Sequence, residues 1–131
     1  MIETGKRTQA CDELFRHLTK AMRREGVSIG GTPGYPRAEI SSVNEQDALD
    51  KGGEVRQITV TIDSMSSRSL GEAMDISQTN LDRIKDAEDE TESFRILGVT
   101  ESTASTMEDM SDTQAVLYRL INNLTFYLSE K

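Results

Sequence analysis

Glu13 and His17, which stand four positions apart, are the residue pair whose types and spacing most suggest chemistry. In a helix this spacing places both side chains on one face, where they could hold a metal ion. No third ligand of comparable quality accompanies them, so charged neighbours on an exposed helix face are the better interpretation. Cys11 lies on the apolar side of the same segment, where a small buried thiol is the common case. We predict no metal site here.

Two further segments have the composition of ligand-binding loops but lack their arrangement. The glycines of 26–34 follow a predicted helix and precede a predicted strand, whereas phosphate-binding loops run from strand to helix. The acidic run 86–90 begins like a calcium loop, but Thr91 occupies the position of the sharp-turn glycine. A solvated acidic connector fits that run better. We therefore expect a protein that is not an enzyme and has no cofactor.

The composition indicates one domain, spanning 1–131, with a small apolar core. Only 35% of the 131 residues are hydrophobic, and the mean hydropathy is −0.53. A domain of this length buries about two-thirds of the surface that its unfolded chain exposes. The sequence has neither an apolar run long enough to span a membrane nor an apolar N-terminal signal segment. The lone cysteine fits a protein made in a reducing cytosol.

Charge is distributed unevenly along the chain. The net charge is −8, which argues against a protein that wraps DNA. Residues 1–37 hold seven basic and four acidic groups, whereas residues 86–112 hold nine acidic groups and one arginine. Complementary segments of this kind can steer like subunits together. The inter-subunit charge candidates are Arg16, Lys20, Arg23 and Arg24 on the basic side, and Asp86, Asp89 and Glu90 on the acidic side.

Two segments have the apolar periodicity of amphipathic helices. The first covers 4–25, with Arg23 and Arg24 expected in its last turn and Gly26 as its stop. The second begins at a capping box formed by Ser69 and Glu72 and extends to about residue 87.

Four segments are predicted strands, and two polar loops separate them. The strands are 35–43, 54–65, 94–100 with a bulge at Gly98, and 114–128. The last segment also fits a helix, but its Thr-Phe-Tyr run favours a strand, with a bulge at Asn122–Asn123. The loops are 44–53 and 101–113.

This order, α-β-β-α-β-β, predicts an α+β domain. We expect a mainly antiparallel four-stranded sheet with both helices packed on one face.

The order of elements resembles the tail-terminator, or tail-completion, proteins that form part of the neck of tailed bacteriophages. The resemblance rests on a strand entered through Tyr35-Pro36, the alternating strand "RQITVTID", the capped helix, and the strand "FRILGVT". It also rests on the ending "AVLYRLINNLTFYL", which carries Arg119 before an aromatic-aliphatic run. It covers roughly residues 4–128.

What this resemblance implies is structural work in a virion. Such proteins form a ring, typically a hexamer, that ends the tail tube and joins it to the head-completion or connector proteins. DNA passes through the lumen without being read, no membrane is involved, and the chain would be made in the cytoplasm of the bacterial host.

We expect the two polar loops to contact the neighbouring proteins. The candidate contact residues are Asp47, Asp50 and Lys51 in one loop, and Met107, Glu108, Asp109 and Met110 in the other. The two methionines could instead fold back onto the core of the domain.

Two other functions remain open from the sequence. A small bacterial adaptor of the same layout would be a monomer or dimer with one exposed apolar patch. An enzyme would need a deep pocket that holds at least two titratable groups with shifted pKa values.

Overall fold

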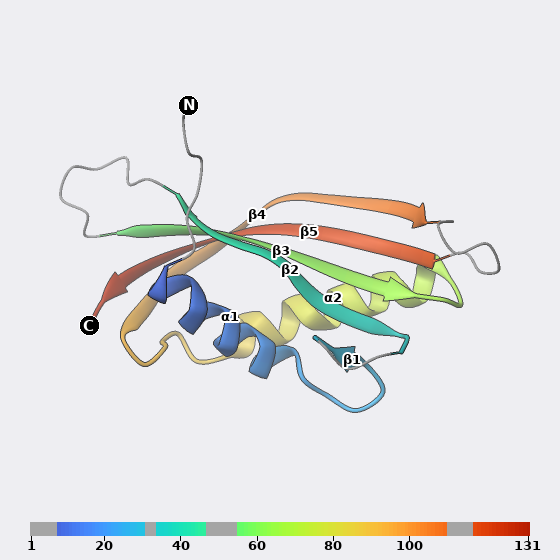
Figure 1. The fold of residues 1–131 in the computed structure, drawn as a ribbon, viewed down its shortest axis with the longest axis horizontal. Coiled ribbons are helices and arrows are strands. Elements are labelled where there is room, and N and C mark those ends of the chain that lie inside the picture. The colour runs from blue at the N-terminus through green and yellow to red at the C-terminus, as the bar shows by residue number, and fades with distance from the viewer. Residues whose placement is uncertain (1–7, 31–33, 47–54, 110–116) are drawn as a thin grey trace.

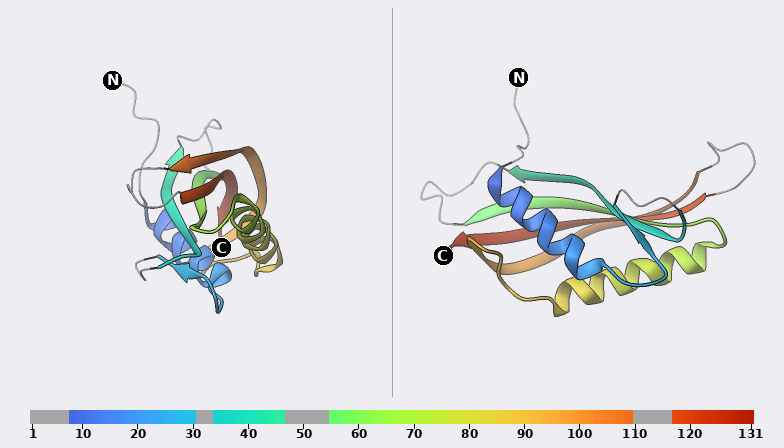
Figure 2. Two further views of the ribbon diagram at one scale, coloured as in Figure 1. Left: turned by 90° about the vertical axis from the view of Figure 1, so that its right-hand side faces the viewer. Right: turned by 60° about the horizontal axis from the view of Figure 1, so that its bottom comes forward.

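The chain folds into one curled sheet with two helices on one of its faces (Figures 1 and 2). The computed structural model describes residues 8–30, 34–46, 55–109 and 117–131. The elements in chain order are α1 (Gln9–Met22), β1 (Ser28–Ile29), β2 (Arg37–Gln46), β3 (Arg56–Ser66), α2 (Leu70–Asp86), β4 (Phe94–Asp109) and β5 (Leu117–Glu130). The α+β class and the two helices are as predicted.

The sheet differs from the prediction in its number of strands. It has five strands in the order β1-β2-β3-β5-β4, and β1 runs parallel to β2 while the other neighbours are antiparallel. The unpredicted strand, β1, is two residues long, and the amide of Ser28 donates to the carbonyl of Pro36 at 2.9 Å. The sequence does not predict this strand, because two residues are too few to show the period-two pattern of a strand. It is recognised only by its pairing with β2.

The core lies where β3 and β5 face the helices. Alternate residues of these strands point to this face and are buried, as the period of two requires. They are Ile58, Val60 and Ile62 on β3, and Leu124, Phe126 and Leu128 on β5. From α1 the predicted apolar stripe packs against them with Ala10, Cys11, Leu14, Leu18 and Met22.

Both helices begin at side-chain caps. Thr8 caps α1 by accepting from the amide of Cys11 at 3.4 Å, so the helix begins later than predicted, and residues 4–7 lie outside the described part of the chain. The helix ends at Met22, which places Arg23 and Arg24 after the last turn. Ser69 caps α2 as predicted.

The capping box of α2 is not reciprocal. Glu72 turns to the hydroxyl of Ser66, which donates to its carboxylate at 2.6 Å. That hydroxyl oxygen accepts from the amides of Arg68 and Ser69. Ser66, at the end of β3, therefore provides the acceptor for the amide of Ser69 that Glu72 was expected to provide.

The strand β4 is longer than predicted and forms a long hairpin with β5. The predicted loop 101–113 is strand up to Asp109, paired with β5 as far as Leu117. The strand Leu117–Glu130 confirms the strand interpretation of the last segment, but it has no bulge at Asn122–Asn123. The register shifts lie in β4 instead, between Ile96 and Gly98 as predicted, and between Glu101 and Thr103.

Polar side chains fix α2 against the sheet. The amide of Asn80 donates to the hydroxyl of Ser64 at 3.0 Å. The hydroxyl of Ser77 donates to Asn122 at 2.7 Å, and Asn122 in turn donates to the carboxylate of Glu101 at 2.7 Å. Asn122 is thus a buried anchor for the helix rather than an interruption of the strand.

We predict that Ile58→Asp or Ile62→Asp prevents folding. Each side chain is at most 1% exposed, and a charge there has no partner among the surrounding apolar groups. The cost is several kcal/mol against a total stability of about 5–15 kcal/mol. Gln57→Asp, on the opposite face of β3, is the matched control and should melt cooperatively near the wild-type temperature. A cooperative thermal transition in either isoleucine variant would contradict this assignment of the core face.

Candidate functional site

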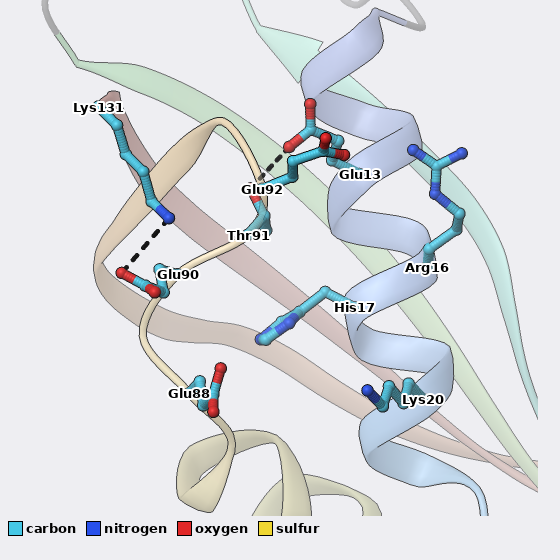
Figure 3. A pocket seen from close by; sticks show the side chains of 9 residues that line it. All are labelled: Glu13, Arg16, His17, Lys20, Glu88, Glu90, Thr91, Glu92 and Lys131. Carbon is cyan, nitrogen blue, oxygen red and sulfur yellow. Dashed lines mark hydrogen bonds and ion pairs between the residues drawn. The ribbon is translucent and has the colours of Figure 1, made fainter.

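A charged groove runs between α1 and the connector that joins α2 to β4 (Figure 3). Its cavity has a volume of 420 Å³. The residues that line it are Glu13, Arg16, His17 and Lys20 from α1, Glu88, Glu90, Thr91 and Glu92 from the connector, and Lys131. In Figure 3, His17 and Lys20 point toward the connector, whereas Arg16 points away from it. The groove is therefore a place where the basic and acidic segments of the sequence meet within one chain.

Glu13 attaches α1 to the connector. Its carboxylate accepts from the hydroxyl of Thr91 and the amide of Ser93, both at 2.9 Å, and from Gln9 at 3.1 Å. Burial raises the pKa of Glu13, but the hydrogen bonds from Ser93, Thr91 and Gln9 together outweigh it, so the pKa lies below its usual value. The carboxylate predicted as half of an exposed pair with His17 is instead 5% exposed.

Arg24 performs a similar task at the other end of α1. Its guanidinium donates to the carbonyl of Met22 and to the side chain of Asn80, both at 2.8 Å. Burial, assisted by the charge of Arg83, lowers the pKa of Arg24. Through Asn80 the arginine is connected to Ser64 of β3, so α1, α2 and the sheet share one polar cluster. Because this guanidinium is engaged within the chain, we keep only the other charge candidates for inter-subunit contacts.

The remaining charge candidates lie on two sides of α1. Arg16 and Lys20 line the groove with Glu90, and Asp86 lines an adjoining cavity of 650 Å³ with His17, Lys20 and Arg83. Asp89 is exposed beside the start of β4, where its carbonyl accepts from the amide of Ile96 at 2.8 Å. Arg23 is exposed and lines a separate cavity with residues 26–29 next to β1.

A partly buried ion pair lies on the face of the sheet that the helices leave free. The guanidinium of Arg119 donates to the carboxylate of Asp63 at 3.1 Å, and Asp63 is 3% exposed. The sequence drew attention to Arg119, but nothing in it identified Asp63 as the partner. The pair joins β3 to β5 near the end of β3.

The predicted contact residues divide between strand and undescribed segments. Asp47, Asp50, Lys51 and Met110 lie outside the described part of the chain. Met107, Glu108 and Asp109 belong to β4 and not to a loop. They pair with Arg119, Tyr118 and Leu117 of β5. Among the described residues, no group of three His, Cys, Asp or Glu could hold a metal ion, and no helix is long and apolar enough to cross a membrane.

We predict that Glu13→Ala destabilises the fold by about 1–3 kcal/mol, because it removes the carboxylate that accepts from the buried hydroxyl of Thr91 and from the partly buried amide of Ser93. Glu92→Ala, which removes an exposed carboxylate from the same groove, is the control and should be nearly neutral.

The lowered pKa of Glu13 also gives the sign of a pH effect. The ionised carboxylate adds stability above its pKa in the unfolded chain, and that stability is lost as the pH falls through the folded-state pKa. The stability difference between wild type and Glu13→Gln, measured by urea unfolding, should therefore shrink from pH 7 to pH 3. A difference that stays constant or grows on acidification would refute this role of the charge.

Comparison with known proteins gives a match of fold and no match of sequence. No family model and no curated protein sequence matches the chain. Among solved structures, a chain from the structure titled "Virion of native gene transfer agent (GTA) particle" matches with a TM-score of 0.66. The match covers 95% of this chain and 100% of that chain, at 15% sequence identity. At this identity the likeness shows a shared fold along nearly the whole chain.

Proposed function

We propose that this protein is a structural component of a phage-like virion, namely the ring protein that ends the tail tube and joins it to the head. The observation that carries the proposal is the end-to-end likeness of fold to a chain of a gene transfer agent virion. The tail-terminator resemblance of the sequence supports the same assignment. Under this proposal the chain resides in the tail or neck of the particle after synthesis in the cytoplasm of a bacterial host.

The shape of the protomer suits this work. The paired ends of β4 and β5 lie at the right of the molecule in Figure 1, at the end where α2 begins, and β4 is the outer strand there. The residues predicted as partner contacts, Met107, Glu108 and Asp109, lie in this end of β4. An outer strand at one end of the domain can contact a neighbouring tail tube or connector protein while the rest of the domain keeps its own core.

The charge of the protomer suits passage of DNA rather than binding. The net charge of −8 gives the ring a surface that does not hold a polyanion. We therefore propose that DNA crosses the lumen without sequence-specific contacts. The proposed partners are further copies of this chain, the tail tube protein and a head-completion protein. The resemblance to tail-terminator proteins implies that the copies form a hexameric ring.

The test is assembly on purified tail tubes. We predict that the chain caps tube ends as a closed ring, visible by electron microscopy, and stops further tube growth. An open filament of this chain, or a lone monomer on the particle, would overturn the proposal.

A shortened hairpin tests the proposed contact surface. In this variant, residues 108–118 are replaced by Asn-Gly, which joins Met107 to Arg119 at their paired register. We expect an unchanged melting temperature and loss of capping, because Asn122 and the core of β5 remain. As the control, only residues 110–116 are replaced by a Gly-Ser linker of equal length, which leaves the paired strands intact. Normal capping by the shortened variant would show that the hairpin does not make the contact.

A further inference from the structure

The two edges of the sheet are each covered at one end only. At one edge, β1 pairs with Arg37 and Ala38 of β2. At the other, the connector covers the start of β4, where Glu90 forms a bridge with Arg95 and the amide of Ile96 donates to the carbonyl of Asp89. Within the described residues, no strand pairs with the outer edge of β2 beyond Ala38 or of β4 beyond Ile96.

We propose that the free edge of β4, from Thr103 to Asp109, pairs antiparallel with the free edge of β2, from Ser42 to Gln46, in a second copy of this chain. The inference rests on the proposed ring and names the contact that builds it. Copies joined in this way form one continuous sheet around the ring.

The direction of the strands fits a head-to-tail contact. Since β2–β3, β3–β5 and β5–β4 are all antiparallel, β2 and β4 run in opposite directions at the two edges. When a second copy is placed beside the first with its helices on the same face, its β2 runs antiparallel to β4. Each copy then contacts one neighbour through β4 and the other neighbour through β2. Such a contact between two different surfaces is heterologous, and heterologous contacts can close into a ring.

The chemistry of the two edge segments permits pairing. Natural sheets protect free edges with charged side chains, above all lysine, and with proline or bulges; the charged residues here are Glu45 in one segment and Glu108 and Asp109 at the end of the other. Neither Ser42–Gln46 nor Thr103–Asp109 contains a lysine, an arginine or a proline. The register shifts lie just before each segment, between Ile40 and Ser42 and between Glu101 and Thr103, so both segments are regular strand.

The helix layer favours a second copy of this chain as the occupant of the free edge. The helices pack on β2, β3 and β5 but barely reach β4, whereas α1 lies against β2. A second copy docked by its β2 would therefore bring its α1 toward the uncovered side of β4.

Adjacent proline substitutions test the free edge. Neighbouring residues of an edge strand direct their amides alternately to the partner strand and outward. Of Ser105→Pro and Thr106→Pro, one therefore breaks a hydrogen bond to β5 and the other removes only an outward donor. We expect the variant that retains the wild-type melting temperature to lose ring formation on tail tubes. Intact rings from that variant would overturn the proposal.

A disulfide scan covers the case in which both proline variants unfold. Paired strands bring Cα atoms to about 4.5–5.5 Å, within the range that a disulfide spans. Chains carrying Asn44→Cys together with Thr103→Cys, Ser105→Cys or Met107→Cys are assembled on tubes and oxidised, with Cys11, which is buried, left in place. We expect one of these double variants to give a covalent ladder that ends at a closed ring, while each single variant stays monomeric.

The outcomes separate this contact from the proposed function. Rings on tubes without cross-links in any double variant would overturn the edge pairing and leave the ring protein in place. Dimers from a single variant at Ser105 would show a two-fold contact between β4 strands instead. Absence of any ring in the presence of tubes would overturn the proposed function itself.

Discussion

The apolar stripe that β3 and β5 turn toward the helices is the constraint on which the rest of the fold depends. Six side chains of these two strands are buried almost completely: Ile58, Val60 and Ile62 of β3, and Leu124, Phe126 and Leu128 of β5. Among the described residues, the opposite face of these two strands buries only Asp63, Met65 and Thr125. Both helices therefore lie on the apolar face, and the outer strands add few apolar side chains to the core, such as Val43 and Phe94.

The two helices meet this face by different means. Helix α1 contributes five buried apolar residues, whereas α2 combines four buried apolar residues with polar bonds through Ser77 and Asn80. A buried hydrogen bond contributes little net stability, but leaving either partner unpaired is costly. The polar contacts therefore favour one position of α2 along the sheet, since sliding the helix by a turn would break the hydrogen bonds of Ser77 to Asn122 and of Asn80 to Ser64.

The sequence predicts the elements whose burial is periodic and fails where burial is absent. Both helices, β3 and the strand character of β5 follow from periodic apolar residues, and Ser69 from a local cap. The end of β4 is rich in serine, threonine and acidic residues, because it lies beyond the core and is held by hydrogen bonds to β5. The partners that join Glu13, Arg24 and Asp63 to other elements lie more than 50 positions away, so no local pattern identifies them.

The two bulges of β4 would have a geometric consequence for the proposed ring. Each places an extra residue in one strand, which bends that strand and increases its local twist. In a closed sheet, the number of strands, their tilt and their stagger are linked, so the bend within one protomer sets the angle to the next. Gly98, whose surroundings leave open space, stands at the first of these bends. In the proposed ring, the diameter of the channel would thus depend on one or two backbone residues of the outer strand rather than on the core that keeps each protomer folded.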